Sequence, residues 1–442
     1  MGVKVGAEGY NGGWETVVSP WPEISRKRDW NNCSMRVLFA LPHCPMPPNS
    51  GGKLLTLQAI EALSSKHELA FVVLKGPDLS EDVAGLHRFG DVTAVAAPHR
   101  RSVLHRVGFR AGYSLAALAT GTPLHAYYGC PAPFWRAVQR KAEEWRPEVV
   151  HYDFWYSALR DLGSPSYRRL LLEQDVEFVR RLREAELASS ARKWWLNKVA
   201  SSVRRAESRV LRQVDCVMAV TPRDARVAAE VGARKVVVFP VAIDTEDRCP
   251  PSREPDAPNI LFVGSFVHTP NVDGILWFAR EVLPRVLSVH PSARLTIVGA
   301  DPPQPVRELA QGTDRILVTG WVTDVSPYYA SARVVIAPLR FGSGIKLKVL
   351  EAMSFGRPVV TTSVGAEGMD VMPGENIFVQ DTPEGFAEAI CVVLAYPEHA
   401  RAVGLAGRAL VEQQYSKEAA RRKILHIYEQ EADASLQTAG NC

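Results

Sequence analysis

Short apolar runs alternate with amphipathic stretches along most of the chain. Residues 36–41 form a run that predicts a buried strand, and apolar side chains then recur at helical spacing between residues 54 and 63. The run 69–74 predicts the next strand. More strands of the same kind are expected at 92–97, 149–153, 170–174, 216–220 and 235–241. Such apolar strands separated by helices indicate a parallel sheet covered on both faces.

The pattern is interrupted once and then starts again. Residues 247–258 contain four prolines among charged residues, without an apolar period, which is typical of a stiff linker. A helix is expected at 272–289, and the end of the chain from 383 to 432 is helical in pattern. Strands are expected at 260–263, 295–298, 316–319, 334–337, 359–362 and 377–379. The chain is therefore predicted to be an α/β protein with two doubly wound, Rossmann-like domains.

The domain boundaries follow from these interruptions. Residues 1–34 show no periodicity, so we interpret them as a flexible extension or as sequence upstream of a start at Met35. The first domain is expected to span 35–246 and the second 259–414, joined by the linker 247–258. Residues 415–442 are expected to form a helix that crosses back to the first domain, followed by a tail.

One segment of the first domain is both amphipathic and rich in arginine. It covers residues 178–212 and carries Trp194 and Trp195 in its middle. The ordinary interpretation, which we favour, is a solvated helix whose tryptophans pack on the domain. The alternative is a basic interfacial helix that makes peripheral contact with anionic lipid at the inner face of a membrane.

Composition narrows the functional classes. The net charge of +4 over 442 residues is too small to indicate a nucleic-acid-binding protein. The seven cysteines are widely spaced without a C-x-x-C pair, so we expect a reducing, cytoplasmic environment and no disulfide framework. No apolar run approaches the ~20 residues of a membrane span, and no signal peptide is recognisable.

The candidate chemistry lies between residues 334 and 365. A strand leads into a turn with Gly342 and Gly344, and the following helix carries Lys346, Lys348 and Glu351. Glycines at such a turn expose backbone N–H groups at a helix N-terminus, where a phosphate is favoured. Arg340 and the two lysines could neutralise two linked phosphates. A plain strand–helix turn beside a solvated helix is the alternative, but the whole constellation favours phosphate binding.

These motifs resemble a known family. Residues 260–400 are similar to the nucleotide-sugar-binding domain of family 4 glycosyltransferases, which have the GT-B fold, and a looser similarity extends back to Met35. The matching stretches are 262–266, 268–273, 338–346, 347–353 and 356–360. The resemblance implies a retaining, metal-independent transferase that moves a sugar from a UDP- or GDP-sugar to an acceptor hydroxyl. The acceptor would be a glycan, a lipid-linked molecule or a small molecule.

The resemblance also assigns roles in the second domain. Arg340 and Lys348 would clamp the diphosphate as catalytic residues, with Lys346 as an alternate, and Glu351 would contact the ribose. Ser343 stands where many members have the first of two glutamates, so the chain resembles the Gly-x-Gly-x-x-x-Lys subgroup. The remaining residues assigned to the nucleotide sugar are Gly264, Val322, Gly342, Ser343 and Gly344, with Val322 beside the base.

The first domain carries weaker matches. Gly51 and Gly52 resemble the family's glycine loop, which borders the donor phosphates and the acceptor pocket. His151 resembles the active-site histidine and would face the cleft, where it would orient donor and acceptor; the alternative is a satisfied histidine at a strand end. The segment from Gln174 to Glu177 either lines the acceptor site or begins a capped helix, and the family usually has histidine at position 174.

Several expected signals are missing from the sequence. It has no D-x-D segment and no metal-ligand cluster, so we expect no metal and no cofactor beyond the nucleotide sugar. It has no G-x-G-x-x-G fingerprint after the first strand, which disfavours an NAD-dependent oxidoreductase. A nucleotide-sugar 2-epimerase of the same fold and a non-catalytic sugar-nucleotide-binding protein stay open as alternatives.

Overall fold

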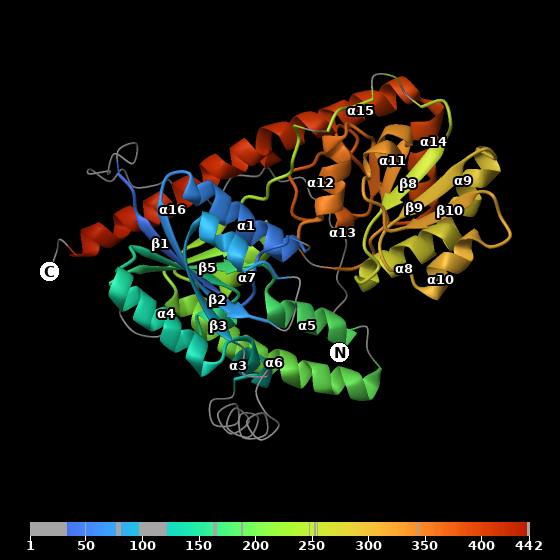
Figure 1. Ribbon diagram of the computed structural model, residues 1–442. Helices are drawn as coiled ribbons and strands as arrows, with labels where there is room; N and C mark the ends of the chain where they lie inside the picture. Colours follow the sequence, from blue (N-terminus) through green and yellow to red (C-terminus); the bar gives the residue numbers. More distant parts are fainter. Residues whose placement is uncertain are drawn as a thin grey trace. The chain divides into compact units, whose positions relative to one another are not determined.

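The computed structural model describes most of the chain after residue 32 (Figure 1). Residues Ser34–Cys442 form one compact unit. The expected extension lies outside the described residues apart from its last two positions, as do Asn49 in the glycine loop and Ser343 in the second turn. The described ranges are 33–48, 50–76, 81–96, 122–161, 166–186, 189–246, 248–251, 253, 255–342 and 344–439.

The N-terminal domain is built on a parallel sheet of seven strands. Their order is β3-β2-β1-β4-β5-β6-β7, and every neighbouring pair is parallel. Strand β1 is buried along almost its whole length, as its apolar run predicts. The strands are β1 Arg36–Leu41, β2 Glu68–Lys75, β3 Gly90–Ala96, β4 Val149–Asp153, β5 Arg168–Glu173, β6 Cys216–Ala219 and β7 Val236–Val238. The helices are α1 Gly51–Ser64, α3 Leu124–Gly129, α4 Ala132–Trp145, α5 Glu177–Glu186, α6 Ser190–Gln213 and α7 Pro222–Glu230.

The C-terminal domain repeats this plan with six parallel strands. Their order is β10-β9-β8-β11-β12-β13. The prediction of two doubly wound α/β domains is therefore confirmed. The strands are β8 Asn259–Val263, β9 Arg294–Val298, β10 Ile316–Gly320, β11 Val334–Ala337, β12 Val359–Thr361 and β13 Phe378–Val379. The helices are α8 Thr269–Trp277, α9 Leu283–Val289, α10 Gln304–Arg307, α11 Ser326–Ser331, α12 Leu347–Ser354, α13 Ser363–Ala366, α14 Pro383–Ala395, α15 Pro397–Leu410 and α16 Lys417–Ala439.

The helix expected at 272–289 is interrupted. Helix α8 passes into a π-helical turn at Phe278–Val282, and α9 follows directly. Pro284 has no N–H to donate and its ring collides with the carbonyl four residues earlier, so a wider turn accommodates it.

The arginine-rich segment 178–212 is two helices, α5 and α6. Our expectation that its tryptophans pack on the domain is wrong, because Trp194 is 65% exposed and Trp195 is 57% exposed. Helix α6 buries a different face, with Leu196, Val203 and Val210 in the interior.

The chain passes between the domains twice, and the two passages lie side by side. The backbone N–H of Ile243 donates to the carbonyl of Tyr415 at 2.7 Å, and Lys417 pairs with Asp244. After the second passage, α16 packs along α1 and against β4 and β5 of the first domain (Figure 1). Ion pairs add to this packing: Lys66 binds Glu429 at 2.6 Å, and both Arg168 and Lys235 bind Glu431, at 2.8 and 2.6 Å.

Among the residues that the structure describes, no single helix is long and apolar enough to cross a membrane. Helix α14 and the helical stretch 397–415 reach that length and composition only together, across a bend of 107°.

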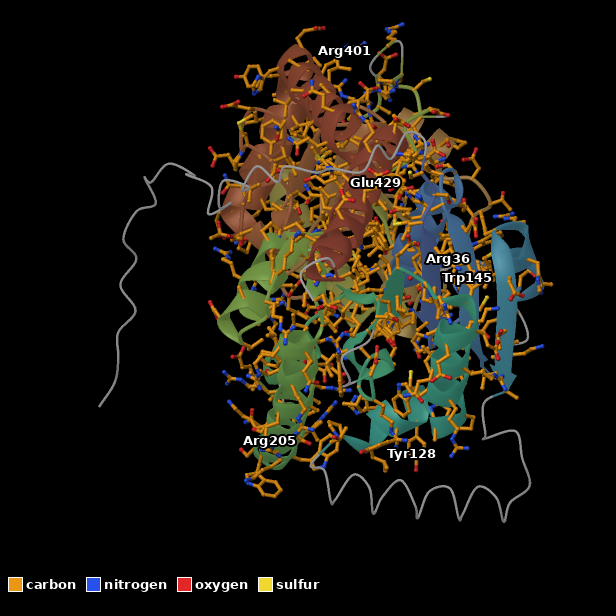
Figure 2. All side chains as sticks on the ribbon, turned by 90° about the vertical axis from the view of Figure 1, so that its left-hand side faces the viewer. Arg36, Tyr128, Trp145, Arg205, Arg401 and Glu429 are labelled. Atoms are coloured by element: carbon orange, nitrogen blue, oxygen red, sulfur yellow. The ribbon has the colours of Figure 1, made fainter. Side chains whose placement is uncertain are left out.

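A cation–π contact lies at the start of the first strand: the Arg36 guanidinium lies over the ring of Trp145, 5.9 Å from its centre (Figure 2).

We expect Tyr428→Phe to lower the free energy of unfolding by about 1–3 kcal/mol, because a buried nitrogen of His151 would lose its hydrogen-bond partner. Chemical denaturation measures this effect. Tyr396→Phe, on a tyrosine that is 63% exposed, is the matched control and should leave stability unchanged. Equal stabilities of the two variants would contradict a stabilising role for the hydrogen bond between Tyr428 of α16 and His151 of β4.

Candidate functional site

In both sheets the strand order reverses at one point. The first sheet grows outward from β1 to β3 and then resumes with β4 on the other side of β1. The second sheet does the same between β8 and β11. Ligands of open α/β sheets bind beyond the carboxyl ends of the strands at such a reversal. The segments after β1, β4, β8 and β11 are therefore the places to search.

The turn after β11 contains two glycines in a left-handed backbone region. The φ angles of Gly342 and Gly344 are +135° and +73°, values that residues with a side chain rarely adopt. The turn leads into α12, which begins at Leu347. A helix N-terminus therefore follows the turn directly, and Lys346, expected on the helix, is its N-cap residue instead.

Lys348 reaches from α12 back to the end of β8. Its ammonium contacts the Asn271 side-chain oxygen and lies over the ring of Phe262, 5.0 Å from the centre. The Asn271 amide nitrogen donates to the Ser265 carbonyl at 2.6 Å, which fixes the orientation of its oxygen. A Cβ atom at Gly264 would lie 2.7 Å from the Lys348 ammonium and 3.0 Å from the Asn271 amide nitrogen, so a side chain there would displace Lys348 from this position.

The protein around the two lysines disfavours their charged forms. Burial and the nearby Lys346 lower the pKa of Lys348 to about 7. Burial also lowers the pKa of Lys346 to about 8, against an opposing effect of Glu367. An anion placed between them would favour both charged forms and reverse these shifts. The turn therefore has the electrostatic character of an anion site.

Two other predicted ligands already have protein partners. Arg340 is 47% exposed and forms a two-pronged pair with Asp273, through Nε at 2.8 Å and Nη2 at 2.5 Å. Glu351 accepts from Arg248 at 3.1 Å, and the Tyr329 hydroxyl lies 3.5 Å from its other oxygen. Arg340 would have to exchange the carboxylate for a phosphate, whereas Lys348 faces a neutral amide.

Glycines also end the strands beside this turn. The N–H of Gly264 donates to Val298, and the N–H of Gly299 donates to Gly320, so the ends of β8, β9 and β10 lie in line. A Cβ at Gly299 would come within 1.9 Å of the Gly264 carbonyl. Val322 follows this rim two residues after β10 and is half-buried. The structure thus places Val322 and Gly264 at one edge of one sheet.

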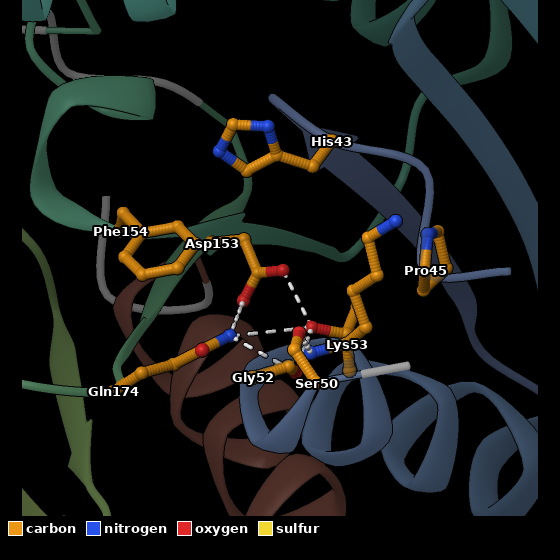
Figure 3. A pocket seen from close by; sticks show the side chains of 9 residues that line it. His43, Pro45, Ser50, Gly52, Lys53, Asp153, Phe154 and Gln174 are labelled. Carbon is orange, nitrogen blue, oxygen red and sulfur yellow. Dashed lines mark hydrogen bonds between the residues drawn. The ribbon is translucent and has the colours of Figure 1, made fainter. Parts of the chain in front are cut away.

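A cavity of about 210 Å³ lies at the reversal point of the first sheet (Figure 3). At its centre the Asp153 carboxylate accepts hydrogen bonds from the Thr56 hydroxyl at 2.6 Å and from the Gln174 amide at 3.2 Å. Lys53 extends into it from the first turn of α1. The lining residues are His43, Pro45, Ser50, Gly52, Lys53, Thr56, Asp153, Phe154 and Gln174.

The glycine loop faces the turn of the other domain. A Cβ at Gly51 would touch the Leu347 side chain at 3.5 Å, so the N-termini of α1 and α12 meet. A Cβ at Gly52 would overlap the Gln174 amide at 1.9 Å. Because the first N–H groups of a helix have no intrahelical acceptor and lie at its positive dipole end, this meeting point suits a phosphate group.

His151 does not face the cleft, and our expectation for it is wrong. The residue is fully buried in β4, where its ring packs on Phe39 at 4.7 Å and parallel to Tyr428. Its Nδ1 shares a hydrogen bond of 2.5 Å with the Tyr428 hydroxyl. The interior of the strand leaves it no access, and Asp153 two residues later is the residue that reaches the cavity.

Glu177 begins α5 and is not among the residues that line the cavity. It accepts hydrogen bonds from Trp155 at 3.1 Å and from Arg181, and it lies 3.1 Å from His125. Against the desolvation that burial imposes, these contacts lower its pKa to about 2. Each of the two alternatives for the segment 174–177 therefore holds for one of its ends: Gln174 lines the cavity, and Glu177 begins helix α5.

Three further residues belong to this site and were not predicted from the sequence: Asp153, Lys53 and Arg183. Asp153 could have been found as a carboxylate on the last residue of a predicted strand, and Lys53 as a cation directly after Gly51 and Gly52. Arg183 of α5 carries no such signal, although its guanidinium donates to the Gly342 carbonyl at 2.6 Å. That contact joins the two domains, so it is visible only in the folded chain.

The second domain matches a known family. Residues 257–396 match the model described as glycosyl transferases group 1. A 30% identical stretch of 139 residues is shared with an uncharacterized 44.6 kDa protein of the cps region of Klebsiella pneumoniae. A 27% identical stretch of 240 residues is shared with the lipopolysaccharide core biosynthesis mannosyltransferase LpsB of Rhizobium meliloti. The matches cover 30% and 50% of this chain and span 36% and 67% of these two relatives.

Solved structures share the fold over nearly the whole chain. Sucrose-phosphate synthase from Thermosynechococcus elongatus is 20% identical with a TM-score of 0.65, covering 91% of this chain and all of its own. The Anabaena protein HepE in complex with UDP is 14% identical with a TM-score of 0.62, covering 90% of this chain and all of its own. These structural neighbours are GT-B glycosyltransferases, and at such low identity they establish the two-domain fold alone.

We expect the affinity for a nucleoside diphosphate to fall as the pH rises above about 7. Lys348 has a pKa of about 7 in the free protein, so at higher pH it must take up a proton when the anion binds. One such proton weakens binding by up to about tenfold per pH unit. Isothermal titration calorimetry with UDP, GDP and ADP between pH 7.5 and 9.5 tests this, because the phosphate, with a second pKa near 6, is already ionised there.

Lys348→Gln is the comparison variant for this titration. It should bind more weakly at every pH and with a shallower pH dependence, since only Lys346 still titrates in the turn. A wild-type affinity independent of pH, or a variant with unchanged affinity, would contradict the anion site.

Proposed function

We propose that this protein is a retaining glycosyltransferase that moves a sugar from a nucleoside diphosphate sugar to an acceptor hydroxyl. The observation that carries the proposal is the meeting of two helix N-termini at the reversal points of two sheets, with Lys346 and Lys348 on one side and Asp153 on the other. The match of residues 257–396 to glycosyl transferases group 1 supports it. HepE was solved with UDP, which is consistent with a uridine or related nucleotide in the same kind of site.

The second domain would bind the nucleotide. The diphosphate would lie at the turn 342–346, where the charge of Lys348 and Lys346 stabilises the leaving group in a partly dry site. Arg340 would join by exchanging Asp273 for a phosphate oxygen. The ribose would be bound by Glu351, which keeps acceptor capacity beside Arg248, and the base would lie near Val322.

The first domain would hold the acceptor. Asp153 is nearly buried, and its two oxygens are fixed by Thr56 and Gln174. A carboxylate has about four acceptor positions, so Asp153 can still accept a hydrogen bond from a sugar hydroxyl in the cavity. In this role Asp153 orients the acceptor oxygen toward the donor, which is the role first assigned to His151.

The reaction balances without a further reactant. The acceptor oxygen forms a bond to the anomeric carbon while the bond from that carbon to the phosphate oxygen breaks. The leaving phosphate oxygen takes the acceptor's proton, and the nucleoside diphosphate departs. Attack from the face that the phosphate leaves retains the configuration. The lysine charges take the part that a metal ion has in other transferases.

Two alternatives are separated by the products. A non-catalytic binding protein would bind the donor without consuming it, and a 2-epimerase would change the sugar without an acceptor. Incubation with a panel of UDP- and GDP-sugars, followed by chromatography of nucleotides and sugars, distinguishes these outcomes. Release of nucleoside diphosphate is the result that we expect.

We expect Asp153→Asn to lower the turnover number by about 100-fold with little change in the donor KM, because orientation of the acceptor is lost while the donor turn is intact. Steady-state kinetics with both substrates varied measures this. Asp91→Asn, which makes the same chemical change at an exposed ion pair with Lys141, should keep full activity. Unchanged turnover in Asp153→Asn would remove the residue from the acceptor site.

We also propose that α6 makes peripheral contact with an anionic membrane surface. Arg192, Lys193, Trp194 and Trp195 are all exposed in its first turns, and Arg205 projects outward further along (Figure 2). Tryptophans favour the membrane interface, and each basic residue near an anionic surface adds about 1 kcal/mol. A transferase acting on a lipid-linked acceptor would gain from this contact.

The double variant Trp194→Ala, Trp195→Ala is expected to reduce binding to vesicles of phosphatidylcholine with 30% phosphatidylserine by about tenfold, a loss of roughly 1.4 kcal/mol. Co-sedimentation measures bound protein. Trp321→Ala removes a tryptophan that is 70% exposed in the other domain and should leave binding unchanged. Equal binding by all three proteins would count against the interfacial helix.

A further inference from the structure

A residue of the first domain holds the phosphate-binding turn of the second. Arg183 lies in the last turns of α5, and its Nη1 donates to the Gly342 carbonyl at 2.6 Å. Within the second domain the Lys346 ammonium donates to the Gly344 carbonyl at 2.5 Å, whereas the Gly342 carbonyl is bound by Arg183 of the first domain. Because glycine adopts positive and negative φ angles about equally readily, its own conformational preference does little to fix the backbone at Gly342 and Gly344.

The remaining contacts of Arg183 show how it is placed. Its Nη2 lies 3.8 Å from Glu367, and the same carboxylate oxygen is bound by Arg223 of α7 at 2.7 Å. Thr221, which caps α7, would touch a Cβ at Gly368 at 3.2 Å. Two helices of the first domain thus meet the segment 367–368, but only α5 extends a contact to the turn.

The charge of Arg183 also acts on the turn. It opposes protonation of Lys346, whose pKa burial lowers to about 8. Three cations therefore converge on this turn from two domains, and a bound diphosphate would relieve their repulsion. A guanidinium hydrogen-bonded to a carbonyl stays fully charged and oriented.

We propose that Arg183 is a positioning residue for donor binding, which fixes the glycine turn from the opposite domain and adds positive charge at the diphosphate. This inference rests on the proposed function, because it names a determinant of the same donor site. Its role differs from that of an ordinary ion pair between domains, for which Arg223 provides the comparison within the same chain.

The test compares Arg183→Gln with Arg223→Gln. Both variants remove a partner of Glu367, but only the first removes the contact to Gly342. Arg183→Gln is expected to weaken UDP or GDP binding by about 10- to 100-fold, the range for loss of a charge-assisted hydrogen bond, and to raise the donor KM in parallel. The acceptor KM should change less than threefold in both variants, and Arg223→Gln should keep donor affinity within about threefold.

Two further measurements keep the outcomes distinct. Arg183→Lys, which restores the charge and one donor, should recover part of the affinity, and thermal unfolding of the ligand-free variants shows whether the fold is intact. Equal effects of Arg183→Gln and Arg223→Gln, or full donor affinity in Arg183→Gln, would overturn the role of Arg183. Wild-type protein that binds no nucleoside diphosphate would instead overturn the proposed function itself.

Discussion

The candidate site depends on one constraint of parallel sheets, the reversal of strand order. At β1 and β4 in one sheet and at β8 and β11 in the other, neighbouring connections leave in opposite directions and open a crevice at the strand ends. The main parts of the candidate site lie at the ends of these four strands: the cavity with Asp153, the glycine loop at Gly51 and the lysine turn. The strand order of the two sheets therefore determines where the candidate site lies, whichever side chains occupy it.

The lysine turn shows what the side chains add. Holding two ammonium groups close together in a partly dry place opposes their charge, as their lowered pKa values show. Glycine at position 264 and the oriented amide of Asn271 make room for Lys348 and hold it. The arrangement is unfavourable for the empty protein and favourable once a doubly charged anion is bound, which is the character of a preorganised binding site.

Much of this could be predicted from local patterns, because buried parallel strands are apolar runs with sharp ends. The strand at 149–153 and the turn with Gly342 and Gly344 lie where the sequence placed them. The assignment of His151 failed because side chains two residues apart in a strand share a face, so His151 and Asp153 are equivalent in pattern, but Asp153 stands at the end of β4 and His151 in its interior. The prediction that the tryptophans of α6 pack on the domain also failed. Adjacent residues of a helix point about 100° apart, so Trp194 and Trp195 cannot both lie at the centre of its buried face, and Leu196 occupies that face.

Contacts between the domains cannot be read from any local sequence pattern, and they differ in strength. Where the chain passes twice between the domains, a backbone hydrogen bond joins Ile243 to Tyr415. This contact uses main-chain groups only, so it does not depend on the identity of these two side chains. At Glu367 the domains are joined by partly exposed ion pairs, which contribute little because solvent screens them. These ion pairs alone therefore do little to hold the two domains together. The Arg183 contact to Gly342 then links the shape of the phosphate turn to whether the two domains are together.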